Sequence, residues 1–297
     1  MRHYRITHAT TYNYSEPVSL CQNIAHLTPR LCAQQHSERS VLSITPDPAV
    51  IEERVDFFGN PVSYFTLQEP HRELSVVVTH RVSVHPGPLP VASSTPSWEE
   101  VRDHLPKDRS PILLDAYQYV FDSRYASADA RYAEYAAKSF TPGRVIFDAA
   151  ADLTSRIHAD FVYDPRATTL ATPVAEVFES RRGVCQDFAH LMLACLRSIG
   201  LAGRYVSGYL STLPPTGQPR LVGADATHAW VSVFCGSAGW VDFDPTNNQV
   251  PADRHILLAW GRDYEDVSPL KGVILGGGQH RVRVGVDVVP EGTDSSA

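Results

Sequence analysis

The chain has 297 residues, of which 43% are hydrophobic and 20% are charged, and its formal net charge is -7. This composition is typical of a globular protein that buries a core of its own. The negative charge and the lack of a basic stripe argue against a nucleic-acid partner. The N-terminal segment has no apolar signal-peptide core, and no run of about 18 apolar residues occurs. We therefore expect no membrane span and a cytoplasmic location.

The first part of the chain predicts a β-strand domain over residues 1–85. Its segments are rich in Val, Ile, Tyr, Phe and Thr, and several alternate apolar with polar residues. Gly59, Asn60 and Pro61 form a turn signal between two of these segments. Residues 86–97 are dense in Pro and Ser, which indicates a linker. The remaining residues, 98–297, are assigned to a second domain.

The second domain begins with apolar residues at helical spacing and continues with alternating strand patterns. Strands are expected in the segments GRYVSGYL, THAWVSVF and GWVDFD, and a last one in HRVRVGVDVV. Helices that precede strands, without βαβ repeats, indicate an α+β fold. Five cysteines occur without a CxxC pair or zinc-ligand spacing, so we expect no disulfide framework, no metal and no cofactor.

Cys185 stands at the start of a strongly apolar helix. Thr172 and Pro173 are expected to begin a preceding helix that Gly183 ends, and Gly200 ends the helix after Cys185. A cysteine in a first helical turn is close to unpaired N–H groups and to the positive end of the helix dipole, which favour a thiolate. The alternative is an ordinary buried thiol.

Two other residues of this helix are given structural roles. Cys195 lies mid-helix on the apolar stripe, so we assign it to the core. His190 is rotated by about 140° from Cys185 around the helix, so it cannot easily act as its base. The base must come from elsewhere in the chain.

A predicted hairpin downstream offers a histidine and an aspartate. Alternation places His228 and Trp230 on one face of the first strand, and Asp242 and Asp244 on one face of the second. A turn centred near residues 236–237 puts His228 opposite Asp244 or on its diagonal, about 5 to 8 Å apart at Cβ. Parity therefore favours Asp244 over Asp242, although a register shift of two would reverse the choice.

The motifs GVCQD, THAWV and DFDPTN, in this order, resemble the transglutaminase-like superfamily of papain-like cysteine enzymes. The strands before residue 85, with DFFGN, resemble the N-terminal domain of its two-domain bacterial type. The resemblance implies Cys185 as nucleophile, His228 as base and acid, and Asp244 as the orienting carboxylate. Segments around Arg262–Tyr264 and Gly276–Gly278 also resemble family positions, and we expect them to form a loop over the cleft or an ordinary polar turn.

Such a constellation predicts acyl transfer through a thioester. The oxyanion would be met by the Cys185 backbone N–H and one further donor. Candidates for that donor or for the substrate cleft are Gln186, Tyr209 and Trp230. We expect a cysteine peptidase or amidase that acts on a protein or peptide. A transglutaminase and a non-catalytic binding scaffold are the alternatives. The sequence leaves a homo-oligomer and the role of the N-terminal domain open.

Overall fold

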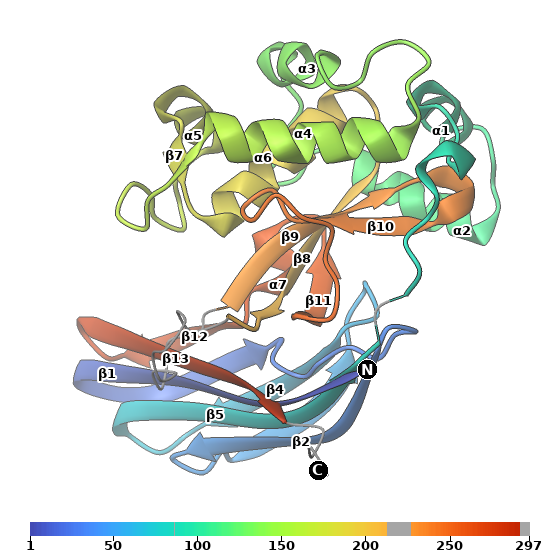
Figure 1. Ribbon diagram of the computed structural model, residues 1–297. Coiled ribbons are helices and arrows are strands. Elements are labelled where there is room, and N and C mark those ends of the chain that lie inside the picture. Colours follow the sequence, from blue (N-terminus) through green and yellow to red (C-terminus); the bar gives the residue numbers. More distant parts are fainter. Residues whose placement is uncertain (86, 213–226, 292–297) are drawn as a thin grey trace, which may run out of the picture.

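The computed structural model describes residues 1–85, 87–212 and 227–291. Three layers are seen in Figure 1: a curved β-sheet that carries the first and last strands, a smaller sheet above it, and a cap of helices on the far side of the smaller sheet. This arrangement confirms the expected α+β class. Among the described residues, no helix is long and apolar enough to span a membrane.

The curved sheet belongs mainly to the N-terminal part of the chain. Seven strands pair in it within the described residues. They are β1 (Arg2–Ala25), β2 (Gln35–Thr45), β3 (Val50–Val55), β4 (Pro61–Leu67), β5 (His71–Val84), β12 (Leu270–Gly276) and β13 (His280–Glu291). Burial alternates along β1, where Tyr4, Ile6, His8 and Thr10 are buried, because successive side chains of a strand point to opposite faces.

The smaller sheet and its helices form the second domain. The sheet order is β10-β9-β8-β11, and all neighbours are antiparallel. These strands are β8 (Gly203–Leu210), β9 (Thr227–Phe234), β10 (Trp240–Phe243) and β11 (His255–Gly261). The helices are α1 (Trp98–His104), α2 (Pro111–Tyr117), α3 (Ala130–Ala137), α4 (Ile146–Asp160), α5 (Val174–Ser180), α6 (Cys185–Ser198) and α7 (Tyr264–Val267). Short 3-10 turns occupy Ala92–Ser94, Gln118–Val120 and Gly236–Ala238. The parallel pair β6 (Val162–Tyr163) and β7 (Arg182–Gly183) lies beside α5 and α6.

The last two strands require a correction of the predicted range 98–297 for the second domain. They pair with β1 in the curved sheet: β13 along residues 3–14 and β12 along residues 18–25. The long β1 has other partners on its opposite edge, β5 and β4, so both halves of β1 are central strands. Alternation in the sequence identified the final strand but carries no information about which sheet a strand joins. Gly276–Gly278 accordingly make the turn between β12 and β13, with Gly277 N–H donating to Pro17 O.

The two domains are held together by a shared apolar cluster. Tyr4, Ile6 and Val82 come from the curved sheet and pack with Ile256 and Leu258 of β11. Polar contacts surround this cluster. Tyr4 Oη donates to Asp253 O at 2.9 Å. A continuous buried interface of this kind holds domains in one relative position.

Two side-chain amides of the N-terminal domain bind the backbone of the edge strand β11. Gln35 Nε2 donates to Leu257 O, and Leu257 N donates to Gln35 Oε1, both at 2.8 Å. Asn60 Nδ2 donates to Trp260 O at 2.8 Å, and Trp260 N donates to Asn60 Oδ1 at 3.0 Å. These amides supply the hydrogen bonds that a neighbouring strand would otherwise make, so the edge of the second sheet is covered.

We expect Asn60→Leu to lower the free energy of unfolding by about 2 to 4 kcal/mol, because Asn60 is fully buried and its loss leaves the N–H and C=O of Trp260 without these partners. Chemical denaturation with a fluorescence readout measures this change. Asn13→Leu, at an exposed position of β1, is the control and should change stability by at most about 0.5 kcal/mol. Equal effects of the two variants would show that the Asn60 bonds contribute nothing particular.

Candidate active site

Cys185 is the first residue of α6 and is half-buried, whereas Cys195 on the same helix is fully buried. The chain enters α6 through Val184 in an extended conformation, and Asp187 Oδ2 accepts the Val184 N–H at 2.8 Å. Thr168 Oγ1 donates to the same oxygen at 2.7 Å. The N–H groups of a first helical turn have no acceptor within the helix, and Cys185 is in that turn. Its backbone N–H is therefore a free donor close to the thiol, and so is the positive end of the helix dipole.

The helix before Cys185 ends earlier than predicted. α5 has Pro173 as its N-cap rather than its first residue, and it ends at Ser180 with Arg181 in the left-handed conformation at φ 57°. Gly183 is therefore no helix terminator. It lies in β7, where a Cβ would come within 2.8 Å of Asp187 Oδ2. The glycine is needed so that Asp187 can fold back on the chain that leads to Cys185.

His190 has the structural role expected for it. Its Nε2 accepts the Tyr264 N–H at 3.2 Å, and its ring stacks on Tyr125 at 5.3 Å. Burial lowers the pKa of His190 to about 3 against the opposing charge of Asp263. Neighbouring Asp263 is buried, accepts from Tyr125 N, and caps α7 by accepting from Glu265 N, so the segment Arg262–Tyr264 begins a short helix.

Acid should destabilise the protein through His190. Folding lowers the pKa of this histidine, so the unfolded chain binds a proton at a higher pH than the folded chain does. The free energy of unfolding is therefore unaffected above the unfolded pKa of about 6.5 and decreases as the pH falls from there towards about 3. In His190→Gln, the Gln side-chain oxygen can still accept a hydrogen bond and does not titrate. We expect this variant to lose about 1.4 kcal/mol less per pH unit than the wild type between about pH 6 and 4. Denaturation at several pH values tests this, with exposed His36→Gln as a control that should leave the slope unchanged.

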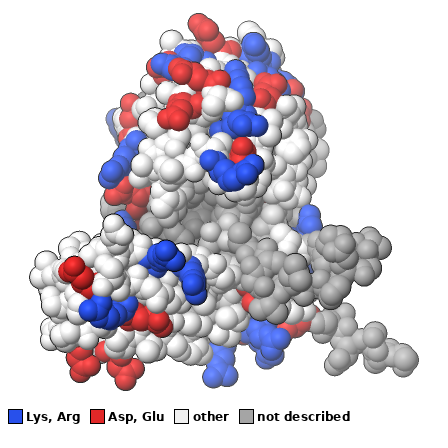
Figure 2. Space-filling view, turned by 90° about the vertical axis from the view of Figure 1, so that its left-hand side faces the viewer, with Lys and Arg blue, Asp and Glu red and all other residues white. Residues whose placement is uncertain are grey.

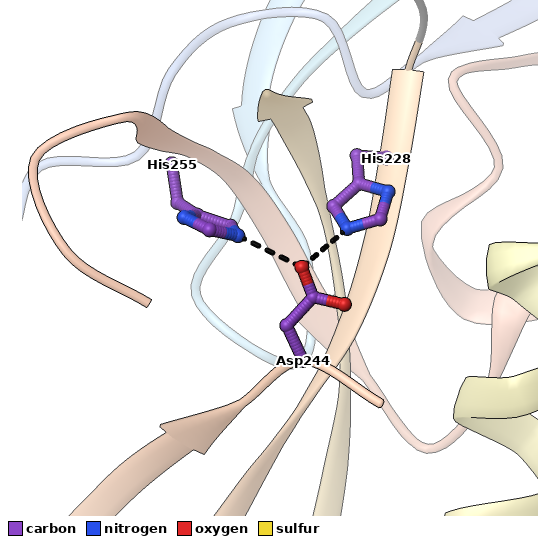
Figure 3. Close-up of side chains that lie close together, drawn as sticks. All are labelled: His228, Asp244 and His255. Atoms are coloured by element: carbon purple, nitrogen blue, oxygen red, sulfur yellow. Dashed lines mark hydrogen bonds and ion pairs between the residues drawn. The ribbon is translucent and has the colours of Figure 1, made fainter. Parts of the chain in front are cut away.

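His228 and Asp244 meet as the alternation predicted. The hairpin pairs Trp240 with Phe234 and Asp242 with Ser232, so Asp244 lies diagonally from His228 beyond the end of β10. His228 Nε2 donates to Asp244 Oδ2 at 2.8 Å, as drawn in Figure 3. Asp242 instead accepts the Trp230 indole N–H at 2.9 Å. The structure therefore pairs His228 with Asp244 and not with Asp242, and the catalytic roles of these residues stay predictions.

Cys185 lies close enough to the same imidazole to contribute to its pKa. Because Nε2 of His228 donates to Asp244, Nδ1 is the nitrogen left for the sulfur. Burial opposes the imidazolium, but the hydrogen bond to Asp244 and the proximity of Cys185 outweigh it and raise the pKa of His228 to about 10. Although burial alone would raise the pKa of Asp244, its hydrogen bonds to His228 and His255 hold that pKa well below its usual range. Both effects favour an imidazolium beside a carboxylate at neutral pH.

Three further residues of the site were not identified from the sequence. His255 Nε2 donates to Asp244 Oδ2 at 3.0 Å, and Asn247 Nδ2 donates to the same oxygen at 2.8 Å. Tyr163 is 55% exposed, and burial together with nearby Cys185 raises its pKa. Asn247 is only three residues after Asp244, in a turn motif that could have suggested it. His255 and Tyr163 reach the site through β11 and through the parallel pairing of β6 with β7, which no local pattern predicts.

The three candidates for oxyanion or cleft contacts differ in position. Tyr209 is fully buried in the interface between the domains, and its hydroxyl is 3.0 Å from His8 Nδ1, so its assignment to the cleft is corrected. Trp230 is 1% exposed and packs its ring behind His228 at 6.1 Å between centroids, so it supports the imidazole and does not line the cleft. Gln186 is half-buried in the first turn of α6. Only Gln186 remains a candidate donor.

Trp230 reaches its position because Gly208 has no side chain. A Cβ at Gly208 would lie 2.5 Å from the indole ring and 2.2 Å from Ile256 O. The indole therefore lies over β8 and meets the ring of His255 edge-on at 5.2 Å.

The surface is hollowed between the two domains on the side where Cys185 begins α6. Figure 2 shows this face, which carries α5, β7 and the ends of β12 and β13, and few charged side chains lie within the hollow. Exposed apolar residues of both domains are found on these elements: Val162 of β6 and Val282 and Val284 of β13. The hollow is thus largely uncharged.

The side chains of His228, Asp244 and His255 could also bind a metal ion. The ligand atoms of His228, Asp244 and His255 lie within 4.8 Å of one another, and two imidazoles with a carboxylate suit Zn²⁺. Both Nε2 atoms, however, already donate to Oδ2 at 2.8 and 3.0 Å, so an ion would have to displace both protons. The arrangement fits a hydrogen-bonded carboxylate better than a metal centre, and the absence of a metal stays a prediction.

A half-buried cysteine at a helix start, beside a histidine and a buried aspartate on a sheet, defines the papain-like class of cysteine sites. Comparisons with known proteins agree. Residues 4–83 match the model of the bacterial transglutaminase-like N-terminal region, and residues 130–245 match that of the transglutaminase-like superfamily. The chain belongs to the transglutaminase-like superfamily.

Its relatives include proteins of similar length. An uncharacterized protein of Mycobacterium tuberculosis is 43% identical over 97% of this chain and 92% of its own, and one of Mycobacterium leprae is 34% identical over 96% and 97%. A protein-glutamine gamma-glutamyltransferase of Pseudomonas aeruginosa is 34% identical over 31% of this chain and 15% of its own. A crystal structure of a Cytophaga hutchinsonii protein, named "Putative Cysteine Protease", has the same fold with a TM-score of 0.76, 23% identity, and coverage of 99% and 92%.

Replacing Asp244 with Asn should slow the alkylation of Cys185 at neutral pH. The amide removes the negative charge that keeps the proton on His228, so the pKa of His228 falls from about 10 and the thiolate loses its imidazolium partner. We expect the rate of alkylation by iodoacetamide at neutral pH to fall by about tenfold or more, the size of one hydrogen bond to a charged group. The rate at Cys185 is read by mass spectrometry. An unchanged rate in Asp244→Asn would contradict this electrostatic coupling.

Proposed function

We propose that the protein is a cysteine peptidase or amidase that hydrolyses peptide or isopeptide bonds through Cys185, His228 and Asp244. The observation that carries the proposal is the placement of one imidazole between a half-buried thiol at a helix start and a fully buried carboxylate. Such an order of nucleophile, base and orienting acid is the requirement for nucleophilic catalysis by a thiol.

In the first half-reaction, the Cys185 thiolate attacks the carbonyl carbon of the substrate. The oxygen becomes an oxyanion, which the Cys185 backbone N–H can meet, with the Gln186 side chain as a second donor. The imidazolium donates its Nδ1 proton to the leaving nitrogen, the C–N bond breaks, and an amine departs. A thioester on Cys185 remains, and His228 is neutral.

In the second half-reaction, His228 Nδ1 accepts a proton from water while the water oxygen attacks the thioester carbon. The C–S bond breaks, a carboxylic acid leaves and gives its proton to the solvent, and the thiolate–imidazolium pair is restored. Asp244 keeps Nε2 protonated in both halves because a carboxylate can only accept a hydrogen bond. The proton therefore always travels through Nδ1.

Transamidation is the second candidate, because the same thioester can pass to a primary amine. The name of the Pseudomonas aeruginosa relative favours it, although that likeness covers a minor part of either chain. The protein or peptide nature of the substrate and a cytoplasmic location are likewise proposals. The largely uncharged hollow of Figure 2 supports a peptide segment as the group that reaches Cys185.

Incubation with fluorescein-casein and dansylcadaverine tests these possibilities together. Hydrolysis predicts new N-termini or released ammonia without dansyl incorporation, and transamidation predicts a dansyl-labelled casein. Either activity should fall by about a thousandfold or more in Cys185→Ala. Cys32→Ala, at another half-buried free cysteine, should retain it.

Activity that survives in Cys185→Ala would rule out the thiol mechanism. A wild-type chain whose Cys185 is alkylated no faster than Cys32 at neutral pH would favour the non-catalytic scaffold.

A further inference from the structure

Asp244 is held by more donors than the pairing with His228 requires. Its Oδ1 accepts the backbone N–H groups of Thr246 at 3.0 Å and Asn247 at 3.1 Å. Its Oδ2 accepts from His228, His255 and the Asn247 side chain. The side chain is completely shielded from solvent. A buried carboxylate needs such partners, because each missing donor leaves charge without solvation.

His255 differs from the other donors because it comes from a separate strand. Asn247 and Thr246 belong to the turn that follows Asp244, and they fix the carboxylate relative to its own backbone. His255 begins β11, on the far edge of the sheet from β10. It approaches Oδ2 from the side opposite to His228, as Figure 3 shows. The oxygen that orients His228 is therefore held between two imidazoles.

The hydrogen bonds identify the nitrogen of His255 that faces Asp244. Nε2 carries a proton because its partner is a carboxylate, which can only accept. Nδ1 is buried and has no hydrogen-bond partner among the described residues. His255 thus offers Asp244 one directed N–H.

The N-terminal domain determines where His255 lies. Its ring is wedged against Trp230, and its strand is bonded on the inner side to β8 with an irregular register between Leu257 and Ala259. On the outer side, the Gln35 amide binds both the N–H and the C=O of Leu257, two residues after His255. Gln35 is itself buried and fixed by a third bond to Arg30 O. A shift of β11 along its axis would break these bonds before it displaced His255.

We propose that His255 is a positioning residue that keeps the Asp244 carboxylate directed at His228, and that the N-terminal domain sets its place through Gln35. The proposal rests on the proposed thiol mechanism and deepens it, because it gives the N-terminal domain a part in the chemistry of Cys185.

The test compares His255→Phe with His255→Gln in the full-length protein. Phe keeps a ring of similar shape without a donor, and Gln places an amide N–H near the position of Nε2. The rate of Cys185 alkylation by iodoacetamide is measured at about pH 6.5 and about pH 10. At the lower pH, we expect His255→Phe to be slower than wild type by about tenfold, the size of one hydrogen bond to a charged group, and His255→Gln to recover most of that loss. At the higher pH, where thiols ionise unaided, all three rates should agree within about threefold.

Several results would overturn the proposal. Equal rates of wild type and His255→Phe at the lower pH would show that Asp244 needs no third support. A loss in both variants at both pH values, together with a lower melting temperature, would assign His255 a packing role only. These outcomes are distinct from failure of the proposed function, in which Cys185 of the wild-type chain already reacts no faster than Cys32.

The part played by the N-terminal domain is tested by Gln35→Leu. This variant removes the amide that binds Leu257, and we expect it to slow alkylation at about pH 6.5 by roughly threefold to tenfold while the rates at about pH 10 converge. Gln34→Leu, at the exposed neighbouring glutamine, is the matched control and should react as wild type. Equal rates for Gln35→Leu and Gln34→Leu would remove the N-terminal domain from the proposal.

Discussion

The buried Asp244 carboxylate is the interaction on which the geometry of the site depends. A carboxylate that is completely removed from water persists only if hydrogen bonds replace its solvation. Here five N–H donors do so, and the donors come from a turn, from β9 and from β11. Because these donors belong to different elements, the carboxylate keeps its position only if the strands of the second sheet keep their alignment. The position of the carboxylate in turn determines how strongly His228 holds its proton.

The thiol side of the site rests on a separate constraint, the apolar helix α6. Its buried residues surround the axis almost completely, so the helix cannot rotate without exposing core side chains. Cys185 is held at the end of this helix, and Asp187 fixes the chain that enters it. One rigid helix thus presents the sulfur, one sheet presents the imidazole, and the two meet because Ala229, Val231 and Val233 of β9 pack against α6 in one core.

The N-terminal domain completes the second sheet and is more than an appendage to it. The edge strand β11 would otherwise expose backbone groups, and side-chain amides of Gln35 and Asn60 cover them. The cation–π contact of Arg30 on the Trp260 ring, at 3.7 Å, adds a further contact across the same boundary. Since the last strands of the chain return to the curved sheet, the second domain is enclosed in sequence by the first, and both are required to form β11 as it is seen.

Local patterns in the sequence predicted most of the elements, the class of fold and the pairing of His228 with Asp244. Apolar spacing identified α6 and the position of Cys185 at its start, and period-two alternation selected Asp244 over Asp242, because both signals depend on neighbours along one chain segment. Only the tertiary structure decided which sheet β13 joins, that Tyr209 faces His8 instead of the cleft, and that His255 supports Asp244. Those contacts join residues far apart in the chain, and alternation tells which face a side chain occupies but not what packs against that face.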